Sequence, residues 1–105
     1  MSIPVVVTAY FRPASGQHDR VAEALRPAIA AVHEEPGCEL YAIHDAPDGT
    51  IVMIETWTSV RDLDDHGVGE AVRALNASLD GLLASPVEVT RLVPLPAGTE
   101  AQGRL

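Results

Sequence analysis

Lysine is absent from this sequence and cysteine occurs once, and both scarcities exclude classes of chemistry. A protein without lysine has no residue for Schiff-base formation and no lysine general base. Because Cys38 is the single thiol, no intrachain disulfide and no cysteine-rich metal site can form. No signal peptide is visible, and the apolar run from Ile3 to Val7 is far shorter than the ~20 residues of a membrane-spanning helix. These absences predict a cytoplasmic protein without membrane contact.

Basic charge and aromatic side chains are also scarce. The 7 basic residues against 15 acidic ones give a formal net charge of −8, and an acidic domain repels nucleic-acid phosphates. The aromatic residues are Tyr10, Phe11, Tyr41 and Trp57, so the core has to consist mostly of Val, Leu, Ile and Ala. A single domain of 105 residues buries roughly 60–70% of its unfolded surface, so pairing with a second copy would add stability.

The periodicity of the apolar residues predicts the element order β-α-β-β-α-β. The predicted strands are Ile3 to Arg12, Cys38 to Asp45, Thr50 to Thr58 and Val87 to Val93. The predicted helical segments are Gln17 to Glu35, with a kink at Pro27, the short acidic turn Arg61 to His66, and Glu70 to Ala84. Residues 1–93 are therefore predicted to form one domain, and the Pro- and Gly-rich residues 94–105 a tail.

This order is typical of an α+β, ferredoxin-like fold with a four-stranded antiparallel sheet and helices on one face. Both faces of the first strand are apolar: Val5, Val7, Ala9 and Phe11 alternate with Val6, Thr8 and Tyr10. No element remains to cover the second face, so we predict a homodimer in which two sheets pack face to face.

The turn sequence Ala46-Pro-Asp-Gly49 predicts a hairpin between the second and third strands. A register with His44 opposite Ile51 pairs Ala42 with Met53, Leu40 with Glu55 and Cys38 with Trp57 on one face.

Two segments carry a resemblance to a known family. Residues 51–66 read IVMIETWTSVRDLDDH and residues 35–41 read EPGCELY. A Glu-x-Trp at the end of the third strand, followed by a helical turn and a histidine, resembles the antibiotic biosynthesis monooxygenase family, in particular its small quinol-monooxygenase-like members. The similarity in element order covers Val5 to Val93. It implies a dimeric α+β barrel with a pocket in each monomer between sheet and helices.

The resemblance also implies an activity. Family members of known activity oxidise electron-rich aromatic or quinol-type substrates with O₂ and use no metal, flavin or haem, so no cofactor is expected. Haem-degrading relatives use an Asn on the first strand together with the Trp and the His. Tyr10 stands at that position here, which counts against haem degradation.

His66 and Trp57 are the first two candidate catalytic residues. An unperturbed imidazole pKa of about 6.5 suits His66 for removing a proton near neutral pH. The alternative is a surface histidine beside three aspartates, Asp62, Asp64 and Asp65, which do not share one helix face and do not predict a metal site. Trp57 is expected to stack on a planar ligand, and the alternative is a core tryptophan.

Three further residues complete the candidate site. Tyr10 is a candidate donor to a substrate oxygen, or only a packing residue. Glu55, on the same partly buried face, is expected to form an ion pair with Arg12 or Arg91. His44 is expected at the pocket rim, where it binds substrate or meets solvent.

The sequence thus supports a cofactor-independent monooxygenase most directly. A homodimer that binds a small ligand without catalysis is the alternative, and a haem-binding or haem-degrading protein is the third. The triplet His33-Glu34-Glu35 is interpreted as a solvated helix end.

Overall fold

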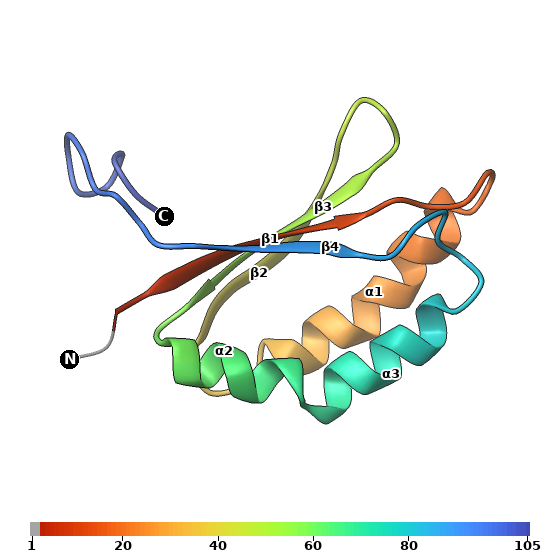
Figure 1. The fold of residues 1–105 in the computed structure, drawn as a ribbon, viewed down its shortest axis with the longest axis horizontal. Helices are drawn as coiled ribbons and strands as arrows, with labels where there is room; N and C mark the ends of the chain where they lie inside the picture. Colours follow the sequence, from red (N-terminus) through yellow and green to blue (C-terminus); the bar gives the residue numbers. More distant parts are fainter. Residues whose placement is uncertain (1–2) are drawn as a thin grey trace.

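The computed structural model describes residues 3–105, which form four strands and three helices. Their order is β1 (Val5–Phe11), α1 (His18–Val32), β2 (Cys38–Asp45), β3 (Ile51–Trp57), α2 (Val60–Gly67), α3 (Glu70–Leu79) and β4 (Glu88–Leu92). The strands pair in the spatial order β2-β3-β1-β4, and every pair is antiparallel. All three helices lie on one face of this sheet (Figure 1). The predicted α+β, ferredoxin-like fold is confirmed.

The short acidic segment is a helix of two turns rather than one. Ser59 caps α2: its hydroxyl accepts a hydrogen bond from the Asp62 amide at 3.1 Å. The third helical segment, predicted to reach Ala84, ends at Leu79, because Gly81 adopts a left-handed φ of 77° that a helix cannot contain. The chain then turns back along the end of β1, where the Ala84 amide donates to the Arg12 carbonyl at 2.8 Å.

The predicted hairpin register was wrong over most of its length. Cys38 does pair with Trp57, but the register shifts between Cys38 and Leu40, so that Tyr41 pairs with Glu55 and His44 with Val52. A β-bulge adds one residue to β2 and reverses the face of every side chain after it. Tyr41 therefore points toward the helices, and His44 points away from them. The hydrophobic pattern of β2 is apolar on both faces and so does not reveal the bulge.

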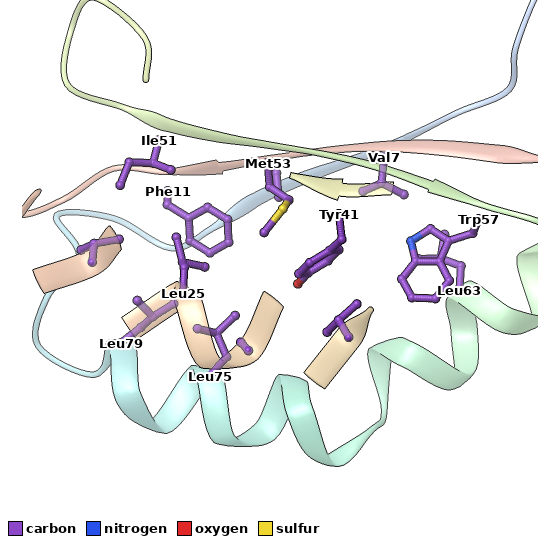
Figure 2. Close-up of a cluster of buried hydrophobic side chains, with 14 of the residues drawn as sticks. Val7, Phe11, Leu25, Tyr41, Ile51, Met53, Trp57, Leu63, Leu75 and Leu79 are labelled. Atoms are coloured by element: carbon purple, nitrogen blue, oxygen red, sulfur yellow. The ribbon is translucent and has the colours of Figure 1, made fainter. Parts of the chain in front are cut away.

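The core lies between the sheet and the helices (Figure 2). The sheet contributes apolar side chains that alternate along each strand, and the helices contribute aliphatic side chains that close the layer. Its buried members are Val5, Val7, Ala9, Phe11, Tyr41, Ile51, Met53 and Trp57 from the sheet, and Val21, Leu25, Ala28, Val32, Leu63, Leu75 and Leu79 from the helices. Within residues 3–105, no helix has the length and apolar character to cross a membrane.

The other face of the sheet has no helix over it (Figure 1). By strand alternation it carries Val6, Thr8, Tyr10, Leu40, Ala42, Val52, Ile54 and Thr56, which are buried or half-buried, and His44, Glu88, Thr90 and Leu92, which are exposed. We call these residues the open face. Beyond β4, residues 94–105 form no helix or strand, and Leu95 is 91% exposed.

Candidate functional site

A cavity of about 300 Å³ lies between the sheet, α2 and α3. Its walls are mostly apolar, and each of the four strands or their ends contributes to them. The lining residues are Val7, Ala9, Phe11, Tyr41, Glu55, Leu63, His66, Gly67, Val72, Leu75, Asn76, Val87, Val89 and Arg91. An apolar cavity with a few convergent polar groups is the usual form of a small-molecule site.

His66 is the histidine that lines this cavity. It lies in the last turn of α2, three residues after the buried Leu63, so both side chains face the sheet. Only 7% of the His66 side chain is exposed. Its Nδ1 lies 2.7 Å from Oε1 of Glu35. The imidazole packs against Trp57, at 4.6 Å between ring centroids, and against Tyr41, at 5.4 Å, and those two rings also contact each other at 6.5 Å.

Sequence reasoning missed Glu35, because it interpreted the triplet His33-Glu34-Glu35 as a solvated helix end. The Glu35 amide donates to the Val32 carbonyl at 2.9 Å, and the chain then turns back into β2. Gly37 makes this turn possible with a φ of 80°, and its carbonyl accepts from the Thr58 amide at 2.9 Å. The segment EPGCELY contained Glu35, but only the path of the chain brings its carboxylate to His66.

Trp57 and Glu55 lie side by side at the end of β3, two residues apart and therefore on the same face. The Trp57 indole Nε1 donates to Oε1 of Glu55 at 2.9 Å. Trp57 is fully buried and does not line the cavity, so it packs behind His66. Trp57 therefore belongs to the core, as the alternative interpretation stated.

Glu55 has no arginine partner, so the predicted ion pair was wrong. Arg12 pairs with Glu88 at 3.3 Å, and Arg91 pairs with Asp64 at 2.7 Å at the mouth of the cavity. Burial raises the pKa of Glu55 above its ordinary value, and the Trp57 hydrogen bond and nearby His66 offset part of that rise.

Tyr41 is a second residue that sequence reasoning missed, because the bulge that turns it into the cavity was not foreseen. Its ring points from the sheet toward the helices (Figure 2). Burial, followed by the negative charges of Glu55 and Glu35, raises the pKa of its hydroxyl. The hydroxyl therefore keeps its proton near neutral pH and can donate a hydrogen bond to a ligand.

Tyr10 and His44 do not join this cluster. Tyr10 pairs with Val52 on the open face, and the Arg12 guanidinium lies 5.5 Å from its ring centroid. The His44 Nδ1 lies 3.3 Å from the Val52 carbonyl, and His44 and His18 are both at the margin of a separate hollow between the start of α1 and the end of β2. The structure thus brings together His66, Trp57 and Glu55 of the predicted residues, and adds Glu35 and Tyr41.

A metal site is not apparent in the part of the chain that the structure describes. No group of three His, Cys, Asp or Glu side chains within residues 3–105 is arranged to hold a metal ion. The aspartates of α2 near His66 have partners within the protein instead of a metal ion. Asp62 accepts hydrogen bonds from Thr58 and Ser59 at the start of α2, and Asp64 accepts one from Arg91.

Comparison with known proteins agrees with this architecture. Residues 4–78 match the family described as antibiotic biosynthesis monooxygenase. A Mycobacterium tuberculosis protein named "Putative monooxygenase Rv0793" is 32% identical over 96 residues, which is 90% of this chain and 95% of the relative. Its solved structure superposes with a TM-score of 0.83, covering 91% of this chain and 99% of the other.

Two further solved structures share the fold. PA3566 from Pseudomonas aeruginosa is 27% identical, with a TM-score of 0.81 and coverage of 90% of this chain and 97% of the other. An antibiotic biosynthesis monooxygenase homologue from Nitrosomonas europaea is 19% identical, with a TM-score of 0.83 and coverage of 93% and 97%. The family match over most of the sequence and the shared fold lead to one conclusion: this chain belongs to the antibiotic biosynthesis monooxygenase family.

Proposed function

We propose that this protein is a monooxygenase that oxidises a small aromatic or quinol-type substrate with O₂, without metal, flavin or haem. The observation that carries the proposal is the position of His66, a base in an otherwise mostly apolar cavity of about 300 Å³. Family membership supports the same reaction class. We place this activity in the cytoplasm, where the free thiol of Cys38 stays reduced.

The chemistry requires little from the protein beyond a base and a dry site. His66 takes the proton of a phenolic hydroxyl, and the phenolate is electron-rich enough to react with O₂ directly. A bond forms between a ring carbon and one oxygen atom, and the proton on His66 passes to the peroxide. Removal of the ring C–H proton then breaks the O–O bond, and the distal oxygen leaves as water.

The balance of this reaction explains why no cofactor is needed. A hydroquinone and O₂ become a hydroxyquinone and water, and the substrate supplies all four electrons. The apolar walls formed by residues such as Phe11, Leu63 and Leu75 hold the ring and exclude water. The Tyr41 hydroxyl donates a hydrogen bond to a substrate oxygen as negative charge develops on it.

Oxygen consumption with a panel of reduced one-, two- and three-ring hydroquinones tests the proposal. We expect uptake above the rate without protein, with one atom from ¹⁸O₂ in the product and one in water. His66→Ala should lower the rate by about 10²–10⁴-fold, as expected for loss of a general base. His18→Ala is the matched control, since His18 lies at the start of α1 and pairs with Asp19 and Asp45. Uptake that is unaffected by His66→Ala contradicts the proposal, and tight binding without turnover supports a non-catalytic ligand-binding protein instead.

We further propose that the protein works as a homodimer joined through the open face. The support is the apolar character of this face, which includes Val6, Leu40, Val52 and Ile54 and has no helix over it (Figure 1). Two such sheets packed face to face would remove these side chains from water. Tyr10 then becomes an interface residue rather than a cavity residue. Sedimentation equilibrium at micromolar concentration is the test, and a monomer at all concentrations would contradict the dimer.

A further inference from the structure

The ion pair of Glu35 with His66 differs from the other ion pairs of the protein in its burial. Oε1 of Glu35 lies 2.7 Å from Nδ1 of His66, and the two side chains are 22% and 7% exposed. The pair between Arg26 and Glu23, by contrast, has side chains that are 67% and 71% exposed. Surface pairs of that kind contribute little, whereas a sheltered, charge-assisted hydrogen bond constrains both partners.

We propose that Glu35 is a positioning residue that holds His66 in the tautomer with hydrogen on Nδ1, so that Nε2 offers its lone pair to the cavity. A carboxylate accepts hydrogen bonds and donates none, so the contact requires a hydrogen on Nδ1. His66 lines the cavity while Glu35 does not, which leaves Nε2 for a ligand. The inference rests on the proposed role of His66 as the base.

The surroundings of the imidazole keep this orientation. Trp57 packs against the ring at 4.6 Å between centroids, and Tyr41 meets it in a T-shaped contact with an interplanar angle of 72°. A half-turn of the ring about its Cβ–Cγ bond would place a carbon-bound hydrogen opposite the Glu35 carboxylate. The charge-assisted hydrogen bond would be lost, so the ring has one favourable orientation.

The position of Glu35 is itself fixed from two sides. Its backbone is bonded at both ends, by its amide to Val32 and by its carbonyl to the Cys38 amide at 3.3 Å. The turn at Gly37 packs closely against the start of α2. A Cβ at Gly37 would collide with the Asp62 side chain there. Because α2 also carries His66, the loop and the histidine are held as one unit.

The charge of Glu35 has a second consequence during the reaction. When His66 takes a proton it becomes an imidazolium ion, which a neighbouring carboxylate stabilises. The titratable groups that face the ring are Glu35 from the loop before β2, Tyr41 from β2 and Glu55 from β3. Of these groups, Glu35 is the one that places a carboxylate oxygen within hydrogen-bond distance of the imidazole, 2.7 Å from Nδ1.

The tautomer can be measured without any substrate. In uniformly ¹⁵N-labelled protein at a pH where His66 is neutral, long-range ¹H–¹⁵N correlations should show hydrogen on Nδ1 and an unprotonated Nε2. Glu35→Gln should convert this signature to a mixture, because an amide can either accept or donate, whereas the control Glu34→Gln at the exposed neighbouring residue should not. Hydrogen on Nε2 in the unmodified protein overturns the inference, whatever happens to Glu35→Gln.

Kinetics with an accepted hydroquinone provide a second readout. Glu35→Gln should lower kcat by less than the ~10²–10⁴-fold of losing the base, with little change in KM. The loss should appear in kcat and not in KM, because Glu35 does not line the cavity where the substrate binds. Glu35→Asp should restore part of the rate. A loss that appears mainly as a higher KM, or that Glu35→Asp does not reduce, contradicts the positioning role. A confirmed tautomer without oxygen uptake contradicts only the proposed activity.

Discussion

The indole of Trp57 lies 4.6 Å from the imidazole of His66, with 34° between the two ring planes. Each ring is bound to a glutamate through a ring nitrogen: Trp57 donates to Glu55, and His66 contacts Glu35. Each ring of this aromatic pair therefore has a carboxylate partner of its own. This arrangement joins the core of the protein to the wall of its cavity, so changes in the pair should affect both stability and activity.

Trp57→Phe should destabilise the protein through Glu55 rather than through the loss of aromatic packing. Phenylalanine keeps a ring beside His66 but leaves the buried Glu55 carboxyl without its donor, which costs about 1–3 kcal/mol. Urea unfolding followed by far-UV circular dichroism measures the change. The double variant Trp57→Phe with Glu55→Leu is the control. If it is no more stable than Trp57→Phe alone, the unsatisfied carboxyl is not the cause.

Glu55→Gln should stabilise the protein at pH 7 and have a smaller effect at pH 4. Burial raises the pKa of Glu55 in the folded protein above its value in the unfolded chain. The protein is therefore most stable below the unfolded pKa, where Glu55 is neutral in both states. It loses this stability as pH rises through the folded pKa and the buried carboxyl ionises. Glutamine stays neutral at both pH values and its oxygen can still accept from Trp57. Thermal unfolding of both proteins across this range is the measurement. A gain that is larger at pH 4 than at pH 7 contradicts the prediction.

Gly37→Ala should be more damaging than Gly49→Ala, although both glycines have left-handed φ values, 80° and 87°. The backbone cost of about 1–2 kcal/mol is common to both. A Cβ at Gly49 meets nothing within 4 Å, whereas a Cβ at Gly37 collides with Asp62. The difference between the two free energies of unfolding therefore isolates the close approach of the loop to α2.

The same pair of variants tests whether the loop positions the site. Gly37→Ala should shift the His66 resonances and lower oxygen uptake, since the loop that carries Glu35 must move. Gly49→Ala lies in the β2–β3 turn and should leave both unchanged. Equal effects on His66 would indicate general destabilisation and contradict a specific role of the loop.

Ile54→Arg should separate the proposed dimer. Ile54 lies on the open face, paired with Thr8 and Ala42, so an arginine there would be buried without a partner if two sheets packed together. Size-exclusion chromatography with light scattering should show a monomer. Val68→Arg is the control, because Val68 follows α2 and is already 75% exposed. A dimer that survives Ile54→Arg contradicts the proposed interface.

The candidate site shows how far sequence reasoning reached. His66, Trp57 and Glu55 were all predicted, and strand alternation together with the helix after β3 is enough to bring them near one another. The faces of Tyr41 and His44 were assigned wrongly, because one bulged residue between Cys38 and Leu40 exchanges the two sides of β2. Tyr10 was assigned from the family resemblance, and the structure places it on the open face.

The order of elements, the ferredoxin-like class and the apolar character of both sheet faces follow from the sequence alone, because alternation and helical periodicity are local properties of the chain. The contact of Glu35 with His66 and the position of Tyr41 in the cavity were decided only by the tertiary structure. Each depends on the path of a loop or on the register of a strand. The sequence suggests that the Glu35 carboxylate is solvated. In the structure it contacts His66, because the turn at Gly37 brings Glu35 against α2.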